Sequence, residues 1–333
     1  MPRSIKGHKP ESADDRSQFI RFHEKEEKIM NKNTKNGKAM VTGFDVFTEM
    51  MRDQVKDILG EGYEVTITEV TKNNDTKYKG LTIRHDGDMI APTIYLEQFW
   101  EDRLDKELKQ IAANVVSMYM AHKEVPQEMM SVKEFCDFGW VKERLFYKLV
   151  NGNMNKELVE KAPHREVMDL ILVYAVHMGN AGGDAIGSVT IKNEHLEMWG
   201  VTEEDLYEIA KENTPRLFEM KAWTMGGMLL ELGHDIGDVD VPMFVLSNKE
   251  KVNGAAIMLY HEKLKELSDK MDSDLYILPS SIHEVIAIPT SIGEPESLKF
   301  MIRQINDTEV SSEEVLSYSL YKYERETNTV SVA

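Results

Sequence analysis

The chain has 333 residues, of which 41% are hydrophobic and 29% charged, so it can bury a substantial core and, at about 150 residues per domain, should form about two domains. Its formal net charge of −18 would repel phosphate backbones, so we expect no direct nucleic-acid ligand. A basic protein partner or divalent cations fit this charge, as does a solvated surface that only aids solubility. The single cysteine, Cys136, excludes a disulfide within the chain, and no apolar run reaches the roughly 20 residues of a membrane span. We therefore expect a cytoplasmic protein with no membrane contact.

The first 40 residues differ from the rest of the chain. They contain ten Lys or Arg against six Asp or Glu, few apolar residues and no helical period. Such a composition does not offset the entropy of ordering a chain, so we expect residues 1–40 to be a disordered N-terminal extension. The alternative is an artefact of start-site choice, since Met30 and Met40 both precede the first predicted element.

Residues 41–125 predict an α-β-β-β-α unit. Apolar residues recur at helical spacing from Phe44 to Val55, and Gly60 supplies a helix stop. A second helix is expected over about 98–120. Between the two helices, turn sequences separate three strand-like runs, which are 64–70, 78–84 and 89–96.

Residues 126–333 repeat the alternation of strands and helices. Strands are expected at 144–151, 167–176, 187–193, 243–247, 255–260, 274–279 and 282–288, a terminal hairpin at 321–332, and helices at 155–163, 202–213, 261–271 and 295–305. Strands joined by short turns and followed by helices predict an α+β fold with mainly antiparallel sheet, built from hairpin-then-helix units. A short sequence motif that begins at Thr93 recurs at Thr190. Either two similar subdomains or coincidence would explain this repeat.

The motifs favour neither a nucleotide site nor a metal site. The glycine-rich stretch 179–187 lies between two predicted strands, where a hairpin loop is expected, whereas a phosphate loop joins a strand to a helix. Asp235, Asp238 and Asp240, beside His234, offer the oxygen ligands that Mg²⁺ or Ca²⁺ prefers, but they lack the EF-hand spacing. We therefore predict no cofactor and no metal, and keep the three aspartates as the metal candidates.

Residues 280–284, between two apolar runs, are the best candidate for a catalytic site because they bring serine, histidine and glutamate together. Alternation along the returning strand would place Glu284 on the face opposite His283, which excludes a triad of these neighbours. A pair of Ser281 and His283 would remain, with an acid from elsewhere, such as Asp274 or a residue of the stretch NEH at 193–195. A turn closed by local hydrogen bonds explains the same residues without catalysis.

Six stretches of the chain carry a resemblance to a known family. They are VTKNN, APTIYLE, PHRE, NEHLEMWGV, LSN…NGAA and LPSSIHEV, and the similarity extends over residues 44–330 in register. In these stretches the chain resembles an uncharacterised family of anaerobic gut bacteria that carries only a domain-of-unknown-function label. The resemblance implies no activity and no site residues.

Two functions stay open on the sequence. A non-catalytic interaction protein with an acidic surface, engaging a basic or nucleic-acid-binding partner protein, is favoured because the sequence lacks nucleotide, metal and nucleophile-elbow motifs. The alternative is a hydrolase or transferase that uses residues 280–284. An enzyme requires a serine, a base and an acid to converge in a pocket, whereas a binding protein requires an exposed patch.

Overall fold

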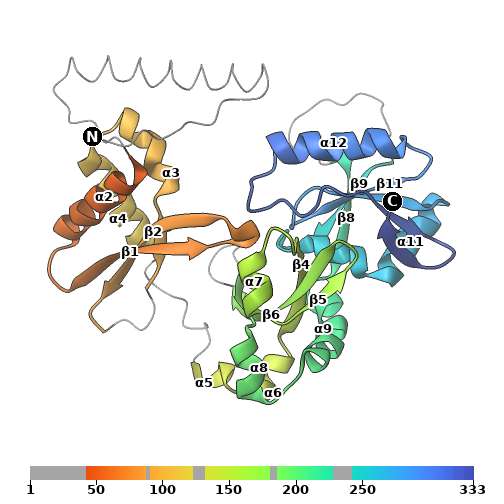
Figure 1. The fold of residues 1–333 in the computed structure, drawn as a ribbon, viewed down its shortest axis with the longest axis horizontal. Helices are drawn as coiled ribbons and strands as arrows, with labels where there is room; N and C mark the ends of the chain where they lie inside the picture. The colour runs from red at the N-terminus through yellow and green to blue at the C-terminus, as the bar shows by residue number, and fades with distance from the viewer. Residues whose placement is uncertain (1–42, 88–90, 123–131, 181–185, 228–241) are drawn as a thin grey trace, which may run out of the picture. The chain divides into compact units, whose positions relative to one another are not determined.

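The computed structural model of the chain describes residues 43–87, 91–122, 132–180, 186–227 and 242–333. The predicted extension, residues 1–40, lies outside these ranges. The described residues form an α+β fold with three antiparallel sheets, as the sequence predicts (Figure 1). They divide into two compact units, whose described residues lie within 43–70 and 78–122 for the first and within 71–77 and 132–333 for the second. None of the described helices has the length and apolar character needed to cross a bilayer.

The first unit packs two helices on one face of a three-stranded sheet. α2 (Phe44–Leu59) buries Phe47, Met51 and Val55, which share one core with α4 (Leu108–His122) and with the inward-facing residues of the strands. The sheet has the order β1-β2-β3. Its strands are β1 (Tyr63–Thr71), β2 (Lys77–His85) and β3 (Thr93–Tyr95), and short helices lie at α3 (Glu97–Trp100) and η2 (Glu101–Leu104). The short helix η1 (Asn73–Asp75), between β1 and β2, groups with the second unit.

The opposite face of this sheet carries a ladder of threonines. Oγ1 of Thr82 lies 2.7 Å from Oγ1 of Thr68 and 2.7 Å from Oγ1 of Thr93, so hydroxyl hydrogen bonds cross all three strands. Because successive residues of a strand point to opposite faces, Leu81 and Ile83 on either side of Thr82 point into the core. An apolar face and a polar face are usual for an antiparallel sheet that is covered on one side.

The first sheet of the second unit is built around β6 (Leu170–Asn180). β4 (Leu145–Val150) pairs with one edge of β6, while β5 (His164–Val167) and β7 (Ile186–Thr190) share the other edge. One face of this sheet joins the main core of the unit, and the other face lies under α7 (Lys156–Lys161). The other helices of this region are α5 (Val132–Phe135), α6 (Phe138–Lys142), α8 (Asn193–Trp199) and α9 (Glu203–Leu217).

The second sheet of this unit has the order β13-β12-β10-β11-β9-β8, and its central hairpin is buried on both faces. Ile277 and Ala287 join the main core, to which α11 (His261–Met271) also contributes, whereas Leu278 and Ile288 pack under α12 (Pro295–Thr308). Burial on both faces explains why these strands read as continuous apolar runs instead of an alternating pattern. The elements are β8 (Met220–Thr224), β9 (Phe244–Asn248), α11 (His261–Met271), β10 (Leu275–Pro279), β11 (Val285–Pro289), α12 (Pro295–Thr308), β12 (Tyr321–Glu324) and β13 (Thr329–Val332).

The strand predicted at 255–260 is wrong, because the chain forms the 3-10 helix η3 (Gly254–Leu259) there. The residues of η3 from Gly254 to Met258 are buried, and a short apolar run that is buried all round has no period that separates a strand from a helix. Asn253 starts this helix with a φ of 53°, in the left-handed region. At Gly254, a Cβ would overlap the carbonyl oxygen of His283, so the chain needs glycine at this close approach.

Candidate functional site

Ser281 and His283, the predicted site residues, lie in the loop 280–284 between β10 and β11. The returning strand begins at Val285, later than expected. Ser281 Oγ accepts a hydrogen bond from the His283 backbone N–H at 3.0 Å, and the Ser281 N–H donates to the carbonyl of Glu284 at 3.2 Å. These contacts close the loop locally, in the manner of a serine turn.

Both ring nitrogens of His283 face groups other than the two serines of the loop. Nδ1 lies 3.2 Å from the backbone N–H nitrogen of Asn253. Because a backbone N–H only donates, Nδ1 is the acceptor, and the proton of the neutral ring lies on Nε2, 3.6 Å from Oε1 of Glu314. Across the ranges that the structure describes, no hydrogen bond joins the hydroxyl of Ser280 or Ser281 to this ring. The arrangement orients an imidazole beside a carboxylate without a serine hydroxyl bonded to it.

Asp274, the acid considered for the same site, precedes β10 at the end opposite to the loop. Its carboxylate accepts the backbone N–H of Arg325 at 3.0 Å and forms an ion pair with Lys322 at 3.1 Å. The Arg325 hydrogen bond and the Lys322 charge lower the pKa of Asp274, against the opposing effect of burial. Asp274 therefore holds the C-terminal hairpin β12–β13 to this end of the sheet.

The metal candidates Asp235, Asp238 and Asp240, with His234, lie outside the described residues. Within the described ranges, no group of three or more His, Cys, Asp or Glu side chains could hold a metal ion. The glycine-rich stretch 179–187 connects β6 to β7, which are antiparallel neighbours, although residues 181–185 are themselves outside the description. It therefore joins two strands of one hairpin, the context predicted for it.

One surface of α12 presents an exposed aromatic side chain among charged side chains of both signs. Phe300 is 62% exposed and its neighbour Met301 is 44% exposed. Glu296 lies four residues before Phe300 and Asp307 seven residues after it, so helical periodicity places all three on the same outward side. Asp307 accepts a hydrogen bond from the hydroxyl of Tyr318 at 3.0 Å, which adds a second exposed ring. We call these five residues the α12 face.

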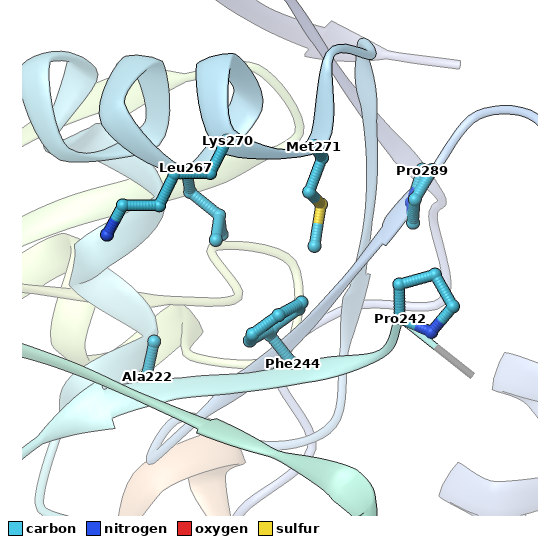
Figure 2. A pocket seen from close by; sticks show the side chains of 7 residues that line it. All are labelled: Ala222, Pro242, Phe244, Leu267, Lys270, Met271 and Pro289. Carbon is cyan, nitrogen blue, oxygen red and sulfur yellow. The ribbon is translucent and has the colours of Figure 1, made fainter. Parts of the chain in front are cut away.

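An apolar pocket of about 400 Å³ lies between α11 and the strands β8 and β9 (Figure 2). Leu267 and Met271 line it from the helix, and Ala222 and Phe244 from the strands. Lys270 is the one ionisable side chain among the described residues of the lining. Since a general acid–base pair needs two positioned ionisable groups, this pocket offers apolar contact and no such pair.

Four lysines line a pocket of about 380 Å³ in the second unit, which we call the lysine pocket. Lys148 comes from β4, Lys161 from the end of α7, Lys192 from the residue before α8, and Lys72 from the segment Thr71–Lys77 that groups with this unit. No sequence motif marks this site, because its residues come from separate elements. The one local signal is Lys148, the only charged residue in an otherwise apolar strand.

Comparison with known proteins identifies the chain by family alone. No curated protein and no solved structure matches it. The model of a family of unknown function, DUF5688, matches residues 44–325, which confirms the predicted membership in an uncharacterised family. Because the match covers most of the sequence, the chain belongs to the DUF5688 family.

Proposed function

We propose that the chain is a non-catalytic binding protein that engages a basic partner protein through the α12 face. The observation that carries this proposal is the exposure of Phe300, 62%, beside the exposed Met301. The charged side chains near it are of both signs, since Glu296 pairs with Lys299 at 3.2 Å and Arg303 is exposed three residues after Phe300. Aromatic and methionine side chains are enriched at protein interfaces, so an exposed pair of them favours a protein partner. The net charge of −18 favours a basic partner, because it steers a positively charged protein towards the chain.

The contacts of loop 280–284 support a binding role over a catalytic one. With Nδ1 of His283 occupied by the N–H of Asn253, this nitrogen is not available as a base for a serine proton. A cytoplasmic location belongs to the same proposal, since Cys136 is a free, exposed thiol of the kind that a reducing compartment preserves.

Photo-crosslinking from position 300 in the native host, followed by mass spectrometry, tests the proposed interface. We expect a partner of net positive charge whose binding weakens as the salt concentration rises. The double variant Phe300→Ala and Met301→Ala should weaken this binding about tenfold or more. Met198→Ala is the matched control, because the exposed fraction of Met198, 47%, is close to the 44% of Met301, but Met198 lies on α8. An equal loss in the control, or crosslinks to acidic proteins alone, would contradict the proposal.

A hydrolase or transferase at residues 280–284 is the second candidate, because Glu314 lies 3.6 Å from Nε2 of His283, where an acid would orient a catalytic imidazole. Catalysis would require His283 to release Asn253 so that the Ser281 hydroxyl could reach Nδ1. A serine-reactive fluorophosphonate tests this candidate. Labelling of Ser281 that disappears in a His283→Ala variant would support it, whereas absent labelling, or labelling that the variant leaves unchanged, would refute it.

A further inference from the structure

Lys148 projects from an apolar strand, on the face of the first sheet that lies under α7. Its neighbours on this face of β4, Phe146 and Val150, belong to two small apolar clusters. On the adjacent strand β6, Lys148 pairs with Val173. The ammonium nitrogen Nζ donates to Oγ1 of Thr190 at 3.1 Å. In the part of the chain that the structure describes, this is its one hydrogen bond, and no carboxylate forms an ion pair with it. An ammonium group carries three donors, so its hydrogen-bonding capacity is incompletely used.

This position is unfavourable for a lysine in the folded protein. Lys148 is partly exposed, and even partial removal of an ammonium group from water without a counter-charge destabilises the charged form, so burial lowers the pKa of Lys148 below its ordinary value of 10.5. A methionine would fill the same apolar surroundings without this penalty. Buried charges with perturbed pKa values are concentrated at functional sites, where a ligand can supply the missing counter-charge.

The lysine pocket as a whole carries an excess of positive charge. Lys72, Lys161 and Lys192 line it together with Lys148, and the acidic residues of the lining are Asp75 and Glu157. Both carboxylates are already engaged, since Glu157 pairs with Lys161 at 2.6 Å and Asp75 accepts a backbone N–H at the start of α7 at 2.9 Å. In a protein of net charge −18, a concave site of the opposite sign attracts small anions locally.

One wall of the pocket is apolar. Val150, Leu158 and Ala162 form it, and the volume of about 380 Å³ lies in the range of small-molecule sites. We infer that the lysine pocket binds a small organic anion, whose carboxylate or phosphate lies beside Lys148 and Lys192 while its carbon skeleton packs against this wall. The site is separate from the α12 face, so the inference does not depend on the proposed partner protein.

Anion binding should be linked to the uptake of a proton by Lys148. A negative charge beside the ammonium group favours its charged form, and so reverses the lowering of its pKa by burial. Between the pKa values of the free and bound forms the complex holds more protons, so affinity should fall as pH rises through that window. The hydrogen bond with Glu157 raises the pKa of Lys161, so Lys161 stays charged throughout this pH window. The titratable and charged groups that face Lys148 from the packed elements are Lys72, Asp75, Glu157, Lys161, His164 and Lys192.

Isothermal titration calorimetry of the full chain with four probes tests the inference. Butyrate and butyl phosphate combine an anionic group with an apolar body, inorganic phosphate supplies the charge alone, and butyramide supplies a neutral body. We expect one of the first two to bind about tenfold more tightly than inorganic phosphate, with the tighter of them identifying the anionic group, and butyramide not to bind. Titration in two buffers of different ionisation enthalpy should show proton uptake.

Variants separate this site from the rest of the surface. Lys148→Met keeps the aliphatic stem and removes the charge, so it should weaken binding about tenfold or more. Lys192→Gln changes an exposed residue and should weaken binding less than Lys148→Met. Lys270→Met, in the apolar pocket, is the matched control and should change nothing.

The inference is overturned if no anionic probe binds, if butyramide binds as well as butyrate, or if both lysine-pocket variants bind like the wild type. Crosslinking from position 300 should be the same in wild type and Lys148→Met, so failure of one proposal leaves the other measurable.

Discussion

Replacing Asp169 by alanine should release the C-terminal segment from the first sheet of the second unit. Asp169 lies in the turn between β5 and β6, and its carboxylate accepts three hydrogen bonds, from Ser317 Oγ at 2.8 Å, Ser319 Oγ at 2.8 Å and the Tyr321 hydroxyl at 2.7 Å. Ser317 and Tyr321 are buried, so the substitution would leave their hydroxyls without this acceptor. Burial and the Asp169 contact raise the pKa of Tyr321, so its hydroxyl is a proton donor at neutral pH.

The expected loss follows from these contacts. A hydrogen bond to a charged group contributes about 1.5–3 kcal/mol. The three bonds share one partly exposed carboxylate and are not additive, so we expect a total of about 4 kcal/mol. In a unit of this size about 2–4 °C of melting temperature correspond to each kcal/mol, which predicts a fall of about 8–16 °C.

Urea unfolding followed by tryptophan fluorescence measures this change, because three of the four tryptophans, Trp140, Trp199 and Trp223, belong to the second unit. Ser319→Ala removes one bond from a partly exposed hydroxyl and should lower the unfolding free energy by about 1 kcal/mol. If Asp169→Ala came within about 1 kcal/mol of the wild type, the carboxylate would not be the tether that the geometry indicates.

Three further outcomes are expected. Between the lowered pKa of Lys148 in the folded protein and 10.5, the folded protein binds fewer protons than the unfolded chain, so the unfolding free energy of the wild type should rise with pH in this range. Urea titrations at several pH values in this range should show that Lys148→Met removes the rise. Gly254→Ala should lower the unfolding free energy by about 3 kcal/mol, because its Cβ would overlap Ser247 Oγ; an unchanged melting temperature would contradict this packing. Burial would raise the pKa of Glu203, but hydrogen bonds from Arg165 and Tyr174 lower it overall. The ionised Glu203 carboxylate therefore stabilises the folded protein above its unfolded pKa of about 4.3, and this stabilisation is lost as pH falls through the pKa of Glu203 in the folded protein. Arg165→Met should flatten this acid dependence, and a dependence equal to that of wild type would show that the ion pair adds nothing.

The fold class was predictable because most elements have a clear period or a clear boundary. The helix predicted from Phe44 onwards ends beside Gly60 as expected, since its apolar stripe and its stop agree. β5 escaped prediction because its sequence, HREV, is polar, and its pairing depends on a neighbouring strand. The wrong strand at 255–260 has the opposite cause, since a fully buried apolar segment loses the pattern on which such predictions rely.

Of the candidate sites, only loop 280–284 was predictable in position, and its contacts were not. Loop 280–284 is visible as a turn between two apolar runs, but the groups that meet the ring of His283, Asn253 and Glu314, are remote in sequence. The lysine pocket is still less visible, because Lys148 and Lys192 are brought together by the pairing of β4 and β7 with β6. Propensity and periodicity describe neighbours along the chain, whereas both sites depend on which distant segments the sheets place side by side.

The sharing of β6 by three partner strands gives the second unit an order of assembly. β4 and β5 precede β6 and β7 follows it, with no other strand between them, so every pairing in this sheet joins segments that are close in the sequence. Loop closure between such segments loses little entropy, which favours early and rapid formation during synthesis. The second sheet should form later, because β12 can pair with β10 only after the intervening β11 and α12 have been synthesised. The amides in the middle of β6, bonded to neighbours on both edges, should therefore be the last in the unit to exchange with solvent.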